Sequence, residues 1–336
     1  MVRRRKKIRS GRVMSVFLLC AIMLLGDAGM MTIQAAPSTG RAANLVVIVR
    51  YQGDTVGDDD TGYNTPYTSQ ISGAPTTYWG LLQRRFNGEN DTFAIGSFRE
   101  YLSRLSGGAH QVESLFPQTV SGERVEYITL DKTLAEYQGS NEISLVAEVA
   151  QKLTEKYPTY DGTLLDRGAS VAIDNLMILA SVPKTGQFTP HTTNAGNSYT
   201  FAGKTIGYYN ILETCTTTLS SGTFWDSFDI ATAAHEYVHT FGVPDYYRTS
   251  GMNGTPVGIW DLMAGSLGRP SLLATTRENI GWAKIAQKTA TSSTYTLYDM
   301  DSAYANGGKS QAYKFYTPFS SSEYFVVEYR RPGKKY

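Results

Sequence analysis

Apolar and polar positions along the chain predict a succession of buried strands and amphipathic helices. The run Asn44 to Arg50 is apolar and rich in β-branched residues, as in a strand that is buried on both faces of a sheet. Residues 171–180 form a second run of this kind. Shorter apolar segments predict further strands at residues 112–116, 125–130, 206–212, 294–298, 312–316 and 324–329, and around Phe201.

Four segments repeat apolar residues at helical spacing, and they cover residues 97–105, 141–157, 230–241 and 272–280. We expect Ser140 to cap the longest helix, which ends before Pro158, and Asp229 to cap the third. The apolar stripe of the longest helix is predicted to comprise Ile143, Val146, Ala147, Ala150 and Leu153. This order of strands and helices predicts an α/β or α+β fold.

The N-terminal segment has the composition of a secretory signal peptide. Seven lysines and arginines within the first twelve residues precede an apolar run, Val13 to Leu25, and small residues follow at Ala35 and Ala36. The apolar run is too short for a comfortable membrane span. We expect cleavage after Ala35 or Ala36 and secretion without stable membrane association. An uncleaved anchor is the alternative, and it also places the remainder outside the cytoplasm.

Removal of residues 1–36 makes the protein mildly acidic. The whole chain has a formal charge of +1, and this segment carries seven basic residues and one acid, Asp27, so the remainder has a charge of −5. A nucleic acid partner is not expected, because it requires a basic face. Cys20 follows two leucines rather than a small residue, which argues against a lipid anchor. Cys215 is then the only cysteine, and no internal disulfide is expected.

The loop after the first predicted strand is acidic. Residues 53–62 contain four aspartates and three glycines, and such a loop can bind calcium, Ca2+. The aspartates do not match the spacing of a known calcium loop. We therefore favour a solvated turn and keep Ca2+ as the alternative.

Metal-ligand residue types recur at ligand spacing in one segment of the chain. His235 and His239 are four residues apart, so both imidazoles lie on one face of the predicted helix and can reach one ion. Glu236 lies between them. This is the HExxH pattern, in which the histidines bind zinc, Zn2+, and the glutamate is the general base for a zinc-bound water. A pair of structural histidines on a buried helix is the alternative.

The residues after the motif suggest a third ligand. Gly242 allows the positive φ of a tight turn at the end of the helix, so that the chain can reverse and return Asp245 to the metal. Glu278, on the downstream helix, is the alternative third ligand in a thermolysin-like arrangement. The other two histidines, His110 and His191, lie in segments that read as loops without a partner motif, and neither is expected to bind the metal.

This part of the chain resembles a known family. His235 to Asp245, followed by two tyrosines, is similar to the HExxHxxGLPDxYD signature of the M6, or immune inhibitor A-like, secreted zinc metallopeptidases. Val257 to Ala264 resembles that family's Gly-x-Trp-Ser-Leu-Met-Ala segment, which provides the methionine turn under the zinc ligands of metzincin enzymes. Met263 is the corresponding methionine, and an ordinary core methionine would pack in a similar way. Residues 97–107 and 278–282 also resemble family segments.

The resemblance implies a metzincin-like zinc peptidase domain with a mixed twisted sheet, a long backing helix, an active-site helix and C-terminal strands. We expect a signal peptide at 1–36, a catalytic domain at 44–283 and a β-rich segment at 284–336. The final predicted strand lies near the end of the sequence, and an incomplete C-terminal segment is one reading of this. Because few residues precede Asn44, we do not expect latency by the inhibitory prosegment that the family often carries.

Three positions depart from the family signature. Val243 replaces a leucine, Asp261 replaces the serine, and Arg248 stands where a second acid is frequent. The last two leave the details of the loop, and any ion bound there, open. They do not affect the predicted zinc chemistry.

These patterns predict a secreted zinc-dependent endopeptidase that acts on protein or peptide substrates, with Glu236 as general base. Two other classes remain: a secreted zinc-binding or adhesion protein without catalysis, and a surface-binding β-rich protein, suggested by the 23 tyrosines. Glu236 argues against both, because a purely structural zinc site rarely needs a base beside the metal. The sequence does not predict the natural substrate, the cleavage preference or the oligomeric state.

Overall fold

The computed structural model describes most of the chain after the predicted signal peptide. The predictions for residues 1–36, including Cys20, and for residues 55–61 of the acidic loop lie outside the described residues. The described residues are 37–54, 62–69, 71–90, 96–182, 189–218, 224–226, 228–248, 256–265, 268, 270–288, 294–299, 310–320 and 322–330.

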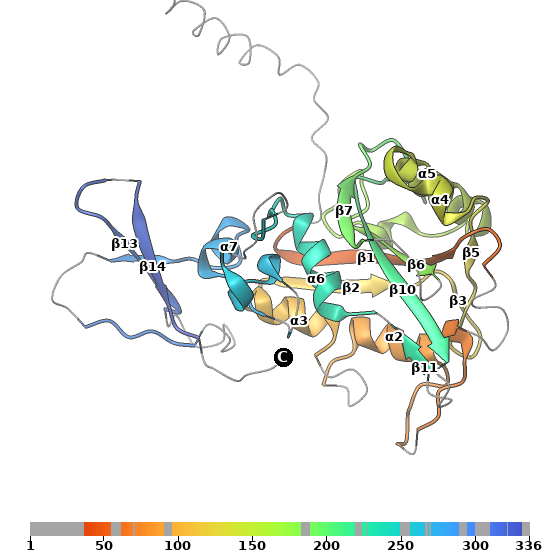
Figure 1. The fold of residues 1–336 in the computed structure, drawn as a ribbon, viewed down its shortest axis with the longest axis horizontal. Helices are drawn as coiled ribbons and strands as arrows, with labels where there is room; N and C mark the ends of the chain where they lie inside the picture. The colour runs from red at the N-terminus through yellow and green to blue at the C-terminus, as the bar shows by residue number, and fades with distance from the viewer. Residues whose placement is uncertain are drawn as a thin grey trace, which may run out of the picture. The chain divides into compact units, whose positions relative to one another are not determined.

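A mostly parallel sheet lies at the centre of the α/β fold (Figure 1). Its strand order is β11-β10-β6-β1-β2, with β5 also paired to β1 and β7 to β10. Strands β2, β5 and β6 are parallel to β1, and β10 is parallel to β6, whereas β7 and β11 are antiparallel to β10. The strands are β1 (Gly40–Arg50), β2 (His110–Leu115), β5 (Ile128–Thr129), β6 (Leu176–Val182), β7 (His191–Asn194), β10 (Tyr208–Thr218) and β11 (Phe224–Asp226).

Alternate residues of β1 enter two different hydrophobic cores. Val46 and Ile48 belong to one cluster, and Leu45, Val47 and Val49 belong to the other. All five side chains are fully buried, because both faces of the sheet are covered. The continuous apolar run that predicted a strand buried on both faces is therefore confirmed.

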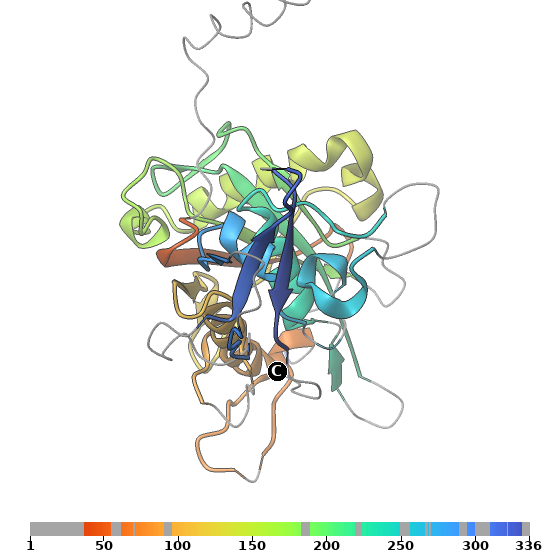
Figure 2. The same ribbon diagram turned by 90° about the vertical axis from the view of Figure 1, so that its left-hand side faces the viewer.

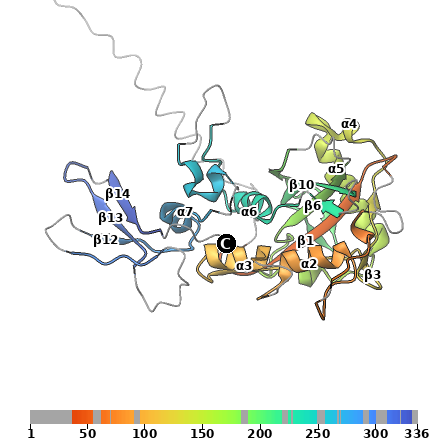
Figure 3. The ribbon, with the colours of Figure 1, turned by 60° about the horizontal axis from the view of Figure 1, so that its bottom comes forward.

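Helices cover the two faces of the sheet (Figures 1 and 3). The face with Val46 and Ile48 packs against α2 (Tyr78–Asn87), α3 (Phe98–Leu105) and α6 (Ile230–His239). The opposite face packs against α4 (Leu134–Tyr137) and α5 (Glu142–Lys156). Helix α3 was predicted over residues 97–105 and begins at Phe98, with Ser97 as the N-cap of a capping box that accepts from the Glu100 amide.

The C-terminal part contains α7 (Ala274–Asn279) and a three-stranded sheet in the order β12-β13-β14 (Figure 2). Its strands are β12 (Ala286–Lys288), β13 (Ala312–Tyr316) and β14 (Tyr324–Glu328). This sheet is bonded to the rest of the chain. The Ala274 amide donates to Glu328 over 2.8 Å, and Arg330 donates to the carbonyls of Trp260 and Leu272.

Two short two-stranded sheets and five short 3-10 helices complete the described secondary structure. The sheets pair β3 (Thr119–Val120) with β4 (Arg124–Val125) and β8 (Thr200–Phe201) with β9 (Lys204–Thr205). The 3-10 helices are η1 (Gly62–Asn64), η2 (Gly139–Asn141), η3 (Gly162–Leu165), η4 (Gly258–Trp260) and η5 (Leu262–Ala264).

Several predicted elements differ from those in the structure. Residues 171–174 do not join the central sheet, because Ile173 donates to the Thr205 carbonyl and so pairs this segment with β9, whereas the carbonyl of Asn175 already accepts from the Leu45 amide of β1. Val171 is consequently 67% exposed. Residues 294–298 form no strand, and the neighbouring Asp299 makes an isolated bridge. The predicted strand at 125–130 is divided between β4 and β5.

Helix α5 also differs in detail from the prediction. Ser140 lies within η2, and Asn141 precedes the first residue of α5, so Ser140 is not the N-cap. Ile143 and Ala147 are only partly buried. The buried face therefore differs from the predicted stripe, and it consists of Leu145, Val146, Val149, Ala150 and Leu153.

The prediction that His110 and His191 lie in loops is wrong. They are the first residues of β2 and β7. His110 is fully buried, stacks on Trp282 at 5.6 Å between ring centroids, and has Nε2 3.1 Å from the Tyr237 hydroxyl. Burial lowers the pKa of His110 to about 4. In contrast, the hydrogen bond from His191 to Glu142 raises the pKa of His191.

We expect the buried His110 to make stability pH-dependent. Because its pKa falls from 6.5 unfolded to about 4 folded, its protonation favours the unfolded state, and stability that is present above pH 6.5 is lost toward pH 4. The loss is about 3 kcal/mol, and His110→Gln should remove it from the difference between pH 7 and pH 4. Urea unfolding in the presence of a chelator measures this.

His191→Gln is the matched control for this experiment. The pKa of His191 is raised, so the stability that it contributes is present below pH 6.5 and is lost as the pH rises through the folded value. Its substitution should therefore act in the opposite direction to that of His110. Equal pH dependence of wild type and His110→Gln would contradict the prediction.

Candidate metal centre

Helix α6 carries the HExxH residues, and its position is set at both ends. At the N-terminus the Asp229 carboxylate accepts from the Thr232 amide over 2.8 Å, as predicted for the N-cap. Ala234 and Val238 are fully buried in the core. The chain leaves the helix through Gly242, which has a φ of 79° and confirms the expected turn.

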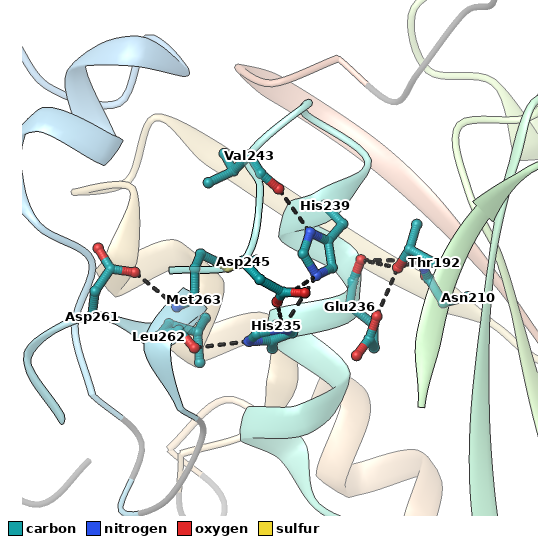
Figure 4. Close-up of polar contacts among 10 residues, drawn as sticks. All are labelled: Thr192, Asn210, His235, Glu236, His239, Val243, Asp245, Asp261, Leu262 and Met263. Atoms are coloured by element: carbon teal, nitrogen blue, oxygen red, sulfur yellow. Dashed lines mark hydrogen bonds and ion pairs between the residues drawn. The ribbon is translucent and has the colours of Figure 1, made fainter. Parts of the chain in front are cut away.

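Backbone carbonyls orient both histidines of the motif (Figure 4). His235 Nδ1 lies 2.8 Å from the Leu262 carbonyl oxygen, and His239 Nδ1 lies 2.7 Å from that of Val243. A carbonyl oxygen can only accept, so each Nδ1 must carry a hydrogen. In the neutral imidazoles, each Nε2 therefore has a free lone pair.

Asp245 returns to the two histidines after the Gly242 turn. Its Oδ1 lies 3.0 Å from His235 Nε2 and 3.3 Å from His239 Nε2, and the two Nε2 atoms are 3.2 Å apart. These three residues form a group of possible metal ligands in the part of the chain that the structure describes. The close approach of three lone-pair atoms is unfavourable unless a proton or a metal ion lies between them.

The donor atoms fit zinc in both chemistry and spacing. Two imidazole nitrogens and one carboxylate oxygen are a common zinc ligand set, and neighbouring ligand atoms around tetrahedral zinc are about 3.3 Å apart. The three observed separations, 3.0, 3.2 and 3.3 Å, are close to this value. The carbonyls bonded to each Nδ1 are the outer partners that usually fix the ring of a metal-binding histidine.

Glu236 lies beside this group and is hydrogen-bonded to residues of the central sheet. Its side chain is almost completely buried, and Oε2 accepts a hydrogen bond from the Thr192 hydroxyl at 3.0 Å. The Thr192 hydroxyl and the Asn210 amide also contact the Glu236 backbone carbonyl. Burial raises the pKa of Glu236, while the two neighbouring imidazoles and the Thr192 hydroxyl act in the opposite direction.

Asp261 organises the segment whose Leu262 carbonyl bonds to His235. The Asp261 carboxylate is completely buried and accepts from the amides of Met263 and Leu273, each at 2.7 Å, and from the Thr276 hydroxyl at 2.9 Å. It thereby joins η5 to α7. Met263 is fully buried in the cluster that includes Val238, and its carbonyl accepts from the Tyr246 amide.

Tyr247 lies beside His235 and Asp245. Its ring is stacked near His235, with 6.3 Å between centroids and an interplanar angle of 22°, and its hydroxyl bonds to Asp245. Burial, the Asp245 charge and this hydrogen bond raise the pKa of Tyr247 to about 12. The hydroxyl therefore remains protonated at neutral pH and can donate to the carboxylate.

Glu278 does not join the group of metal-ligand atoms. Its Oε2 accepts from Lys314 Nζ over 2.7 Å, and its Oε1 accepts from the Ile285 amide over 3.2 Å. Both oxygens thus bind groups of the C-terminal part. This geometry favours Asp245 over Glu278 as the third ligand.

Thr192, Asn210 and the Leu262 carbonyl were missed as parts of the site. They lie 44, 26 and 27 residues from their partners on α6, so the motif gives no indication of them. Thr192 belongs to β7, a short polar strand within a stretch rich in Gly, Ser and Thr. The antiparallel pairing of Thr192 with Asn210, which would have revealed the contact, becomes visible only in the sheet.

No protein-family model matches the sequence, and no curated protein matches it. Within the described ranges, no helix is both long enough and apolar enough to cross a membrane. An assignment of function therefore rests on the motif and on the geometry of the residues around it.

Proposed function

We propose that this protein is a secreted zinc-dependent endopeptidase with a metzincin-like catalytic domain. The observation that carries the proposal is the convergence of His235, His239 and Asp245 beside the buried carboxylate of Glu236. A zinc site of structural type fills all its positions with protein ligands, whereas three protein ligands leave one for water. The signal-peptide pattern of residues 1–36 supports secretion.

The proposed chemistry divides between the metal and the protein. When bound, zinc would supply a Lewis acid that lowers the pKa of a water molecule to about 7. Glu236 accepts a proton from the attacking water and then donates it to the nitrogen of the departing amine. His235, His239 and Asp245 hold the site rigid, because the histidines are fixed by carbonyls and Asp245 by Tyr247.

The test is cleavage of casein by the secreted protein, with and without a zinc chelator. We expect cleavage that is lost on chelation and restored by added zinc, with about one zinc per chain by elemental analysis. Zinc binding without cleavage of casein or of a mixed peptide library would indicate the alternative, a non-catalytic zinc-binding or adhesion protein. Cleavage that survives complete removal of zinc would contradict the proposal.

A further inference from the structure

A row of buried polar side chains crosses the central sheet and ends at Glu236. It starts at Asn44 on β1 and continues through Asn175, immediately before β6, to Asn210 on β10 and Thr192 on β7. The three asparagines are at most 1% exposed. These strands are neighbours in the sheet, and Asn210 and Thr192 are direct cross-strand partners.

The hydrogen bonds fix the direction of each amide in this row. Asn175 Nδ2 donates both to Asn44 Oδ1 at 2.8 Å and to Asn210 Oδ1 at 2.7 Å. A flipped Asn175 amide would instead bring acceptor oxygens together on both sides. With its oxygen held as acceptor, Asn210 must present Nδ2 to Thr192 Oγ1, at 3.0 Å, and to the Glu236 carbonyl, at 3.1 Å.

The direction of the row turns the Thr192 hydroxyl hydrogen toward Glu236. Thr192 Oγ1 accepts from Asn210, so its one hydrogen is available to Glu236. Two Glu236 oxygens lie within reach: the backbone carbonyl oxygen at 2.6 Å and the carboxylate Oε2 at 3.0 Å. The carbonyl contact is the shorter, whereas a charged carboxylate is the stronger acceptor, so the hydroxyl lies between the backbone and the side chain of Glu236 and holds one against the other.

The row of polar side chains is energetically less favourable than apolar packing at the same positions. Asn175 Oδ1 is buried and has no hydrogen-bond partner among the described residues. A buried acceptor left in this way is unfavourable, and apolar side chains would fill the same positions in a parallel sheet without that penalty. The row is thus better explained by the geometry that it imposes on α6.

We propose that Thr192, oriented by Asn210, is a positioning residue that holds the carboxylate of Glu236 in place for proton transfer. The inference rests on the proposed peptidase function, because it assigns Thr192 a role through the general base. One oxygen of the carboxylate is tied to β7, and the other is left for the attacking water. Thr192 acts through Glu236, because its hydroxyl bonds to Glu236 and to Asn210.

The experiment compares Thr192→Val, which removes the hydroxyl at nearly constant volume, with Thr192→Ser, which keeps it. Cleavage of casein supplies a site from which a quenched fluorescent peptide is made, and kcat, KM, zinc content and the midpoint of thermal unfolding are measured. We expect Thr192→Val to lower kcat roughly 10- to 100-fold, the effect of one hydrogen bond to a charged group, with little change in KM or zinc content. Thr192→Ser should recover most of the lost turnover.

Thr193→Val is the control, because Thr193 is exposed on the other side of β7 and its side chain bonds to Tyr209. Three outcomes would overturn the inference: unchanged kcat in Thr192→Val, equal losses in the Val and Ser variants, or loss of zinc from Thr192→Val. If wild type binds zinc and does not cleave, the proposed function fails and this inference falls with it. If wild type cleaves and Thr192→Val cleaves equally well, only the inference fails.

Discussion

Glu236→Ala is expected to bind zinc as wild type does and to lose proteolysis by at least about 100-fold, the lower end of what general acid–base catalysis contributes. Zinc is retained because the three converging ligand atoms belong to His235, His239 and Asp245 and not to Glu236. Activity is lost because the carboxylate of the metal-ligand group, that of Asp245, would be bound to zinc and could not replace Glu236 as the proton acceptor. The measurements are zinc content by elemental analysis and the rate of casein cleavage.

Glu236→Gln is the companion variant, since it preserves the size of the side chain and can still accept from Thr192. It should be as inactive as Glu236→Ala, because an amide cannot accept the proton from water. Casein cleavage at the wild-type rate by either variant would exclude Glu236 as the general base. Loss of zinc from both would instead indicate that Glu236 is needed to form the site.

The residues that the sequence identifies well are those that lie close together in the chain. His235, Glu236 and His239 occupy one helix, so their proximity follows from helical spacing alone. The Gly242 turn needs only the conformational freedom of glycine, and its positive φ agrees with the prediction. The buried strand at 44–50 was also predictable, because a continuous apolar run rich in β-branched residues is typical of a strand that is buried on both faces of a sheet.

The residues that the sequence does not identify reach the site through the sheet. Thr192 contacts Glu236 only because β7 is antiparallel to β10, and the strand order is not encoded in any local pattern. Asp261 stands where the family that the sequence resembles has a serine. From the sequence, this difference indicated only that the loop is altered. In the structure its carboxylate is completely buried and holds η5 against α7, a role that depends on donors up to 15 residues away.

Asp245→Ala is expected to reduce zinc affinity by more than about 100-fold, because even the outer partners of metal ligands contribute 10- to 100-fold. Without the carboxylate, zinc would have only two protein ligands, the imidazoles of His235 and His239 on one turn of α6. Glu278→Ala should bind zinc as wild type does, since both Glu278 oxygens contact Lys314 and Ile285. Competition with a chelator of known zinc affinity measures the dissociation constants.

Asp245→Asn separates the charge of this ligand from its position. An amide oxygen can occupy the place of Oδ1 but has no negative charge, so its zinc affinity should lie between those of wild type and Asp245→Ala. Loss of zinc from Glu278→Ala, with retention in Asp245→Ala, would reverse the assignment and place the third ligand on α7. That result would also require Glu278 to leave its ion pair with Lys314, which is 2.7 Å long in the structure.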